Sequence, residues 1–302
     1  MTPPLHALQP HDPAHLGGRR VLGRIGTGER STVYLAEEPD GTRVAIRVLD
    51  PEGAVDPEAR RRCAREAEAA RRVVCPRTAA VLDADFSSVP AHVVSEYVEG
   101  TGLDRAVADE GPLSGDALMR LAVAVADALV SVHEAGLLHR DLEPGNVVMA
   151  SGGPRVIGFG VSRIIKGVGA PSDPAVGAPG YMSPEHLADG RVTAATDVFS
   201  WGAVVVFAAT GRAPFDAATV PGVLHKVLKV DPELGGLAEP LRSVVAAALD
   251  KDPDARPTSR QVLHRLRDHV CEASRALEAP PATDPPSDAA PADGAGVDTA
   301  PP

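Results

Sequence analysis

The residues whose types and spacing could do chemistry lie in two stretches of this 302-residue chain. One is the polar run 139–146, which places Asp141 and Asn146 five positions apart. The other is a glycine pair, Gly26 and Gly28, between two apolar runs. Glycine lets a backbone pass close to phosphate groups, but glycine pairs are also common in simple hairpin turns. The neighbouring elements have to decide between these two interpretations.

Strands and a helix are predicted around the glycine pair. Residues 21–25 and 32–36 form apolar runs on either side of it, and residues 42–49 follow after a Pro-Asp-Gly turn. Asp56 and Pro57 indicate a helix start, because Asp can cap free N–H groups and proline lacks the N–H that would be unsatisfied at the first helical position. The sequence thus predicts three strands followed by a helix.

A long helix is expected between Ser114 and Gly136, directly before the polar run. Its apolar residues recur at the spacing of one buried helix face. They are Leu118, Leu121, Ala122, Val125, Leu129 and Val132. We interpret this face as core without a cofactor role, so the function of the helix is to position the polar run.

Composition excludes several classes of protein. The net charge of -11 predicts no nucleic-acid partner. No apolar run approaches the roughly 18 residues of a membrane span, and the N-terminal residues do not have the pattern of a signal peptide, so a cytoplasmic location is expected. Residues 1–18 are expected to form a disordered leader and residues 279–302, rich in Pro, Ala and Asp, a disordered tail. The three cysteines lack metal or redox spacing and are expected to be reduced thiols.

About ten motifs in one order resemble the eukaryotic-like Ser/Thr protein kinases of bacteria. They include the segments 26–31, 44–47, 139–146, 158–160, 180–185, 197–202, 210–215 and 250–257. The resemblance implies an α+β protein-kinase fold over residues 19–272, with a β-rich N-lobe at 19–98 and a helical C-lobe at 99–272. A nucleotide cleft is expected between the lobes.

The resemblance also implies roles for individual residues. Asp141 matches the family's catalytic base and Asn146 a Mg²⁺ ligand. The nucleotide-binding positions fall on Gly26, Gly28, Val33, Ala45, Arg47, Glu66, Glu96 and Val98. Those that support the fold fall on His139, Phe159, Glu185, Asp197 and Arg256. Glu66 lies at the spacing from Arg47 at which the family pairs a strand lysine with a helix glutamate, and Arg256 is expected to form a buried ion pair with Glu185.

Five positions depart from the family's pattern. Ser31 replaces a glycine, Arg47 and Glu143 replace lysines, Gly158 replaces the Mg²⁺-ligating aspartate, and Ala178 replaces a hydroxyl residue that contacts the catalytic aspartate. Phosphoryl transfer depends on positioning and on compensation of phosphate charge. No lysine precedes Lys166, so none in the N-lobe could take over the lost role. ATP binding is therefore possible but weak or Mg²⁺-independent, and Mg²⁺ binding through Asn146 alone is doubtful.

These losses predict a pseudokinase that acts as a scaffold or allosteric regulator in signalling. One alternative is a weakly active, atypical Ser/Thr kinase that transfers the ATP γ-phosphate to protein, with Glu143 helping to hold a displaced metal. Another is a nucleotide-responsive sensor. The expected partner is a protein, an active kinase or its substrate, which would contact residues 161–180 and the helix near 220–230. Ser172 is the candidate phosphorylation site.

Overall fold

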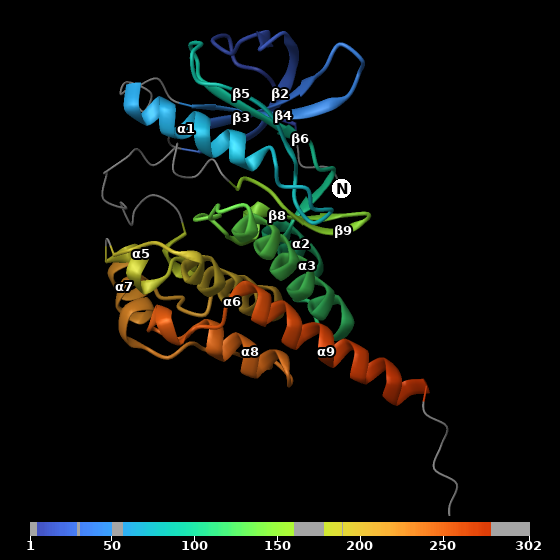
Figure 1. The fold of residues 1–302 in the computed structure, drawn as a ribbon, viewed down its shortest axis with the longest axis vertical. Coiled ribbons are helices and arrows are strands. Elements are labelled where there is room, and N and C mark those ends of the chain that lie inside the picture. Colours follow the sequence, from blue (N-terminus) through green and yellow to red (C-terminus); the bar gives the residue numbers. More distant parts are fainter. Residues whose placement is uncertain (1–4, 29–30, 50–56, 160–177, 189, 279–302) are drawn as a thin grey trace, which may run out of the picture.

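The computed structural model describes residues 5–28, 31–49, 57–159, 178–188 and 190–278. They form a β-rich upper lobe and a helical lower lobe (Figure 1). The upper lobe holds a six-stranded antiparallel sheet in the order β1-β2-β3-β4-β6-β5. Its strands are β1 (His15–Leu16), β2 (Arg19–Gly28), β3 (Ser31–Glu37), β4 (Arg43–Leu49), β5 (Val81–Asp85) and β6 (His92–Glu96). Helix α1 (Pro57–Ala70) packs against β5.

The lower lobe is built around α6 (Ala194–Thr210), which is buried on nearly every side. A helix that is apolar all round is expected at the centre of a core. The Trp201 indole of α6 donates a hydrogen bond to the Ala122 carbonyl (3.0 Å) on α3. The other helices are α2 (Leu103–Glu110), α3 (Gly115–Glu134), α5 (Pro184–Leu187), α7 (Val220–Lys229), α8 (Leu241–Ala248) and α9 (Ser259–Glu278). None in the described part of the chain is both long and apolar enough to span a bilayer.

A small second sheet lies where the lobes meet. It consists of β7 (Gly100–Gly102), β8 (Val147–Ala150) and β9 (Gly153–Val156), in that order. A 3₁₀ turn, Pro144–Asn146, leads directly into β8. The polar run 139–146 therefore lies at the boundary between the lobes, and α3 brings the chain to it as the sequence predicts.

The expectation of a disordered leader is wrong for residues 5–18, which pack on the upper sheet. His6 and Arg24 exchange backbone hydrogen bonds of 2.9 and 3.0 Å. The Asp12 side chain is fully buried, and its carboxylate accepts hydrogen bonds from the Arg24 guanidinium (2.6 Å) and the Tyr34 hydroxyl (2.7 Å). Arg24 holds the pKa of Asp12 well below its usual range. One acidic side chain thus anchors the segment, and neither composition nor periodicity reveals such an anchor. The proposed tail, 279–302, lies outside the described residues.

Asp12→Ala should release this segment from β2, because the Arg24 guanidinium and the Tyr34 hydroxyl would lose their common acceptor. We expect faster amide hydrogen exchange at His6 and Arg24. Glu37→Ala is the matched control, since Glu37 forms a largely exposed pair with Arg20, and such pairs contribute little. Unchanged exchange at His6 in Asp12→Ala would contradict the anchoring role.

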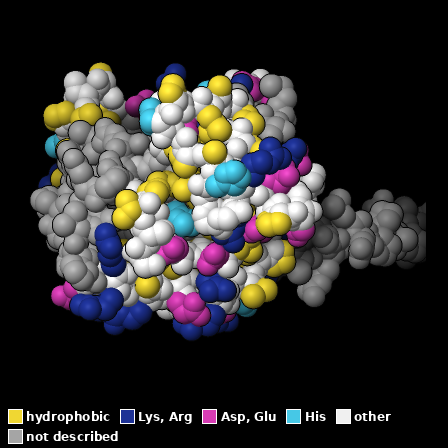
Figure 2. Space-filling view, turned by 90° about the horizontal axis from the view of Figure 1, so that it is seen from above, with side chains coloured by type: hydrophobic (Ala, Val, Ile, Leu, Met, Phe, Trp, Pro, Cys, Tyr) yellow, Lys and Arg dark blue, Asp and Glu magenta, His cyan; other side chains and the backbone are white. Residues whose placement is uncertain are grey.

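Charges of both signs are interspersed on the face seen from above. Lysine and arginine side chains alternate there with acidic ones, and no broad area of one sign dominates the described surface in this view (Figure 2). The face therefore shows no concentrated field for a strongly charged partner.

Candidate active site

The polar run is held from below by Asp197, at the first turn of α6. Its carboxylate accepts hydrogen bonds from the backbone N–H groups of His139 (2.8 Å) and Arg140 (2.7 Å) and from the His133 ring (2.8 Å). Burial alone would raise the pKa of Asp197, but the hydrogen bonds from His133 and the Arg140 N–H and the nearby histidine rings together outweigh it, and the pKa lies below its ordinary value. Asp197 is therefore an ionised anchor for the loop. The other nitrogen of the His133 ring bonds Ser259 (2.9 Å), which is itself buried. This Ser-His-Asp chain is structural.

His139 is fully buried, and burial lowers its pKa. A neutral ring fits its contacts, with Nε2 donating to the Ile157 carbonyl (3.0 Å) and Nδ1 accepting from the Asp141 N–H (3.3 Å). The adjacent Arg140 has a φ of +63°, in the left-handed region. A side chain there carries strain that surrounding contacts must hold. The loop around Asp141 is thus fixed from both sides.

Asp141 and Asn146 meet across the loop, as their spacing suggests. The Asn146 amide nitrogen donates to the Asp141 carbonyl (2.7 Å) and lies 3.5 Å from its carboxylate. The Asn146 amide oxygen faces Gly158, 3.5 Å from the point that a Cβ at Gly158 would occupy. An acceptor oxygen and an ionisable carboxylate therefore border the space beside Gly158.

Arg47 reaches the same space from β4. Its Nη2 lies 3.6 Å from the Cβ position of Gly158. Burial lowers the pKa of Arg47, while the carboxylates of Asp141 and Glu143 act against that shift. Arginine remains protonated even so. The cation of the strand and the two carboxylates of the loop therefore form one charge cluster, although Arg47 and Glu143 are nearly a hundred residues apart.

Glu66 of α1 contacts the loop rather than only the strand. Its carboxylate pairs with Arg140 at 3.5 Å. The sequence spacing suggested a pair between Glu66 and Arg47, and the structure shows Glu66 paired with the loop arginine Arg140. The contact ties α1 of the upper lobe to the lower lobe.

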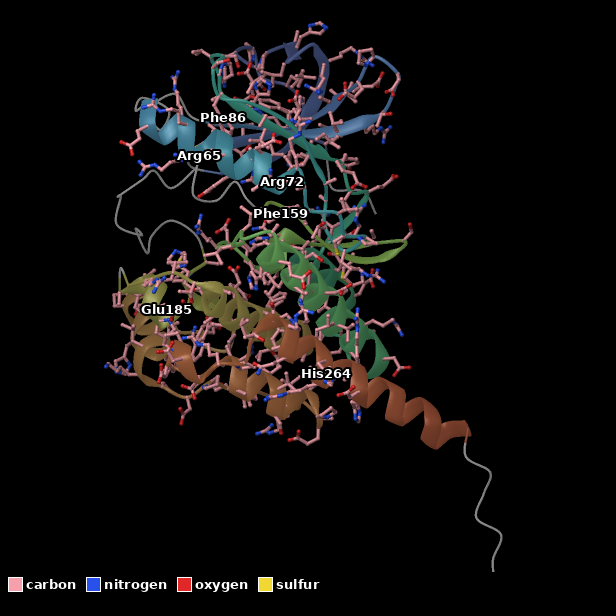
Figure 3. All side chains as sticks on the ribbon, viewed as in Figure 1. Arg65, Arg72, Phe86, Phe159, Glu185 and His264 are labelled. Carbon is pink, nitrogen blue, oxygen red and sulfur yellow. The ribbon has the colours of Figure 1, made fainter. Side chains whose placement is uncertain are left out.

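Phe159, next to Gly158, also joins the lobes. It is 1% exposed and packs in a cluster with Leu49, Ala67 and Val132 (Figure 3). These residues come from β4, α1 and α3. The segment after 159 lies outside the described residues until Ala178, so Ser172 and most of the expected contact segment 161–180 cannot be placed.

A cleft of about 300 Å³ opens between the lobes above the polar run. Of the sequence-predicted nucleotide positions it is lined by Val33, Ala45, Arg47, Glu96 and Val98. Gly26 and Gly28 lie on β2, paired with Val33 and Ser31. Ile25, Asp104, Val148 and Ile157 also line the cleft, and the sequence did not mark them as binding residues. Val148 lies on β8 and Ile157 directly follows β9, so the small second sheet brings both under the cleft.

Arg155 of β9 binds Glu96, the last residue of β6, where the chain leaves the upper sheet. Its guanidinium donates to both oxygens of Glu96 (2.5 Å each) and to the Thr78 carbonyl (2.6 Å). This hydrogen bonding lowers the pKa of Glu96. The Glu96 side chain is thus committed to the protein, which leaves the backbone of Glu96 to meet a ligand in the cleft. Arg155 was missed because nothing in its strand distinguishes it from a solvent-facing basic residue.

Acidic side chains lie on the open side of the loop as well. Burial raises the pKa of Tyr181, and the negative charges of Glu143, Asp216 and Asp104 add to the shift.

The structural pair expected from the sequence is present in the lower lobe. Arg256 donates to both carboxylate oxygens of Glu185 (2.8 and 2.9 Å) and to the carbonyls of Ala195, Asp250 and Lys251. The Arg256 side chain is completely buried. Burial acts to raise the pKa of Glu185, but the hydrogen bonds from Arg256, Ser183, Thr196 and the backbone together outweigh it and lower the pKa to about 2.

The described residues beside Gly158 offer few ligands for a divalent cation. Mg²⁺ prefers several hard oxygen ligands. Within the part of the chain that the structure describes, no group of three His, Cys, Asp or Glu residues is placed to hold a metal. Gly158 offers no carboxylate, and the Arg47 guanidinium beside it has donors where a metal needs lone pairs. Among the described residues, the oxygen atoms that border this space are those of the Asn146 amide and the Asp141 carboxylate, fewer than the ion prefers.

The comparisons of this chain with known proteins agree with one another. The protein kinase domain family matches residues 19–266. The chain is 42% identical over 268 residues to the probable serine/threonine-protein kinase PkwA of Thermomonospora curvata, which covers 88% of this chain and 36% of that protein. It is 42% identical over 265 residues to the serine/threonine-protein kinase AfsK of Streptomyces coelicolor, with 87% and 33% covered. The crystal structure of the Mycobacterium tuberculosis PknI kinase domain superposes with a TM-score of 0.65 at 26% identity, covering 84% of this chain and 96% of that one. The chain spans about a third of the length of these curated relatives.

Proposed function

Because the chain belongs to the protein kinase domain family, with serine/threonine kinases among its bacterial relatives, we propose that it is a pseudokinase. In this role the domain keeps the bilobal kinase fold and binds another protein, without efficient phosphoryl transfer. The family's ligand is ATP with Mg²⁺; here nucleotide binding is weak or independent of the metal. The scaffold or allosteric role, the cytoplasmic location and the signalling context are parts of this proposal.

The observation that carries the proposal is the charge cluster at the phosphate end of the cleft. Arg47, the expected cation, lies in the field of Asp141 and Glu143, and position 158 has no carboxylate. The transferring phosphate would meet a second carboxylate, Glu143, where the family supplies an ammonium. Because catalysis of this reaction rests on positioning and charge stabilisation, these changes remove the means of catalysis and leave the fold.

The expected loss of rate is large. Removing one preorganised electrostatic contact costs about 10²–10³ in rate, so three such losses cost on the order of 10⁶, with non-additivity. Kinases turn over at roughly 1–100 s⁻¹, so little measurable transfer would remain.

The second candidate is a weakly active Ser/Thr kinase that transfers the ATP γ-phosphate to protein. The relatives at 42% identity are named as serine/threonine kinases, which favours this candidate over the first. Asp141 is in place as a base, its backbone carbonyl hydrogen-bonded by Asn146. Against it stand this chain's own residues at 47, 143 and 158. A nucleotide-responsive sensor is a form of the first candidate in which ligand binding alters partner binding.

The partner proposed for the pseudokinase is an active kinase or its substrate. The described part of the proposed contact surface is α7, which presents Val220 at 45% exposure and is followed by Val230 at 37%. A pull-down with the intact chain, compared with a chain ending at residue 278, tests whether the folded domain carries the binding.

Purified protein should not phosphorylate itself or a basic test protein above background. The measurement is radiolabel transfer from ATP with Mg²⁺, and Asp141→Asn is the matched control because it removes the candidate base with minimal change of shape. Transfer by the natural chain that disappears in Asp141→Asn would establish the second candidate. Equal background in both proteins would support the first.

A further inference from the structure

We propose that the cleft is selective for an uncharged nucleoside over nucleoside phosphates, the reverse of the order expected for a phosphoryl-transfer site. The proposal rests on the non-catalytic function above and names the ligand class of its cleft. It follows from three properties of the described residues: the size and lining of the cleft, the chemistry of its inner end, and an acceptor at its lower rim.

The size and walls of the cleft suit one flat, neutral group. Its volume of about 300 Å³ is at the lower limit of small-molecule sites, which span roughly 300–1,000 Å³. Val33 and Ala45 of the upper sheet line one side, and Val148 and Ile157 of the lower lobe line the other. Burying a heteroaromatic ring between such apolar walls favours binding, whereas the phosphate groups of a ligand gain nothing from contact with them.

Among the described side chains at the inner end of the cleft, acceptors for hydrogen bonds outnumber donors that could bind phosphate. Phosphate oxygens accept hydrogen bonds, and ionised carboxylates only accept, so neither Asp141 nor Glu143 can bind them whatever else each contacts. Arg47 is the cation of this end among the described residues, and its charge is already in the field of both carboxylates. A triphosphate would have to compete with them for one guanidinium. A nucleoside brings no charge to this end and avoids the competition.

A bound metal cannot resolve this conflict. In the family Mg²⁺ bridges phosphate and carboxylate, but the donor set beside Gly158 does not fit the ion. The guanidinium of Arg47 reaches to within 3.6 Å of the point where the ligating side chain would begin. Phosphate and carboxylate charges would therefore face each other with no ion to neutralise them.

The lower rim of the cleft has a hydrogen-bond acceptor for the hydroxyl groups of a sugar. Asp104 and the Gly145 backbone both line it, and Oδ1 of Asp104 lies over Gly102, 2.5 Å from the Cβ position of that glycine. A carboxylate oxygen at the rim accepts hydrogen bonds from hydroxyl groups, and the ribose of a nucleoside carries such donors. The same carboxylate repels a phosphate placed near it, and the neighbouring cation that also lines the cleft, Arg105, pairs with Asp109 at 3.4 Å.

The test is a set of calorimetric titrations of the full chain with adenosine, AMP and ATP, each with EDTA and again with Mg²⁺. We expect adenosine to bind at least tenfold tighter than ATP, AMP to lie between them, and Mg²⁺ to leave the order unchanged. In Glu143→Gln the ratio of adenosine to ATP affinity should fall at least tenfold. Glu110→Gln, which removes an exposed acid of α2 that does not line the cleft, should leave the ratio unchanged.

The outcomes separate this proposal from the proposed function. Tighter binding of ATP than of adenosine without Mg²⁺, or no binding of adenosine, would overturn the nucleoside preference and leave the non-catalytic role standing. Mg²⁺-dependent tightening of ATP together with Asp141-dependent radiolabel transfer would overturn both. A ratio that stays constant in Glu143→Gln would refute the charge argument and the selectivity that rests on it.

Discussion

A variant that restores four family residues together, Arg47→Lys, Glu143→Lys, Gly158→Asp and Ala178→Thr, should transfer phosphate measurably where the natural chain does not. The gain should approach the order of 10⁶ that the losses cost, reduced by imperfect positioning. Restoring an ammonium at 143 and a carboxylate at 158 would supply the missing positive charge and metal ligand. The measurement is radiolabel transfer to a basic protein, with Mg²⁺ present.

The geometry at Gly158 shows why single restorations should fail. Gly158 has a φ of +83°, a conformation that aspartate tolerates better than most residues but at some cost in strain. In Gly158→Asp alone the Cβ of the new side chain would lie 3.6 Å from the Arg47 guanidinium, within reach of its carboxylate. It would pair with that cation instead of holding a metal. Gly158→Asp should therefore gain nothing until Arg47→Lys is added.

The matched control for the restored variant is the same protein with Asp141→Asn. Activity that survives this change would come from elsewhere, and the attribution to the cleft would be wrong. A folded fourfold variant without transfer would mean that changes other than these four also block the reaction. In that case, residues away from the phosphate end of the cleft would also prevent phosphoryl transfer.

The sequence could predict the fold because its signals are local and ordered. The glycine pair, the amphipathic helix before the polar run and the Glu185–Arg256 pair each follow from a short motif at a known spacing. The six-stranded sheet and the central position of α6 then follow from the family's architecture. For these features, the type of residue and its position in the chain were sufficient.

The contacts that the sequence could not predict are formed by side chains far apart in the chain. Asp12 anchors a segment that composition describes as disordered, and Arg155 reaches Glu96 from another strand. The sequence shows that arginine replaces the family's lysine at position 47, but not which charged groups surround it. A motif fixes the position of a residue in the chain and leaves open which charges its long side chain meets. Only the fold places Glu143 and Asp141 around that guanidinium.

Arg256→Ala should destabilise the domain by about 3–5 kcal/mol, because it leaves the partly buried Glu185 carboxylate without its partner. It also removes donors from the carbonyls of Ala195 and Asp250 and the guanidinium that lies 4.9 Å from the Phe199 ring. For a domain of this size the change corresponds to a fall in Tm of about 6–20 °C. Thermal unfolding followed by circular dichroism measures it.

Arg267→Ala is the control of the same chemistry at the surface. Arg267 pairs with Asp127 at 3.0 Å, but its side chain is 57% exposed, so its loss should cost less than about 1 kcal/mol. Equal effects of the two substitutions would mean that burial of the Arg256 pair contributes nothing, contrary to the hydrogen bonding seen around it.

Lowering the pH should weaken the Glu185–Arg256 pair in the natural chain. The pKa of Glu185 is lowered from its ordinary value of 4.5 to about 2 in the fold. A carboxyl with a depressed folded-state pKa contributes stability above its unfolded pKa and loses that contribution as pH falls through the folded one. The stability of the natural chain relative to Glu185→Gln, which cannot ionise, should therefore be constant above about pH 5 and shrink progressively towards pH 2. Denaturant titrations of both proteins at pH 7 and pH 3 measure this difference. Protonation of Glu185 breaks the charge pair without removing the side chain. A stability difference that is equal at the two pH values would therefore contradict the role of the charge. It would show that packing and neutral hydrogen bonds hold α5 to the segment before α9.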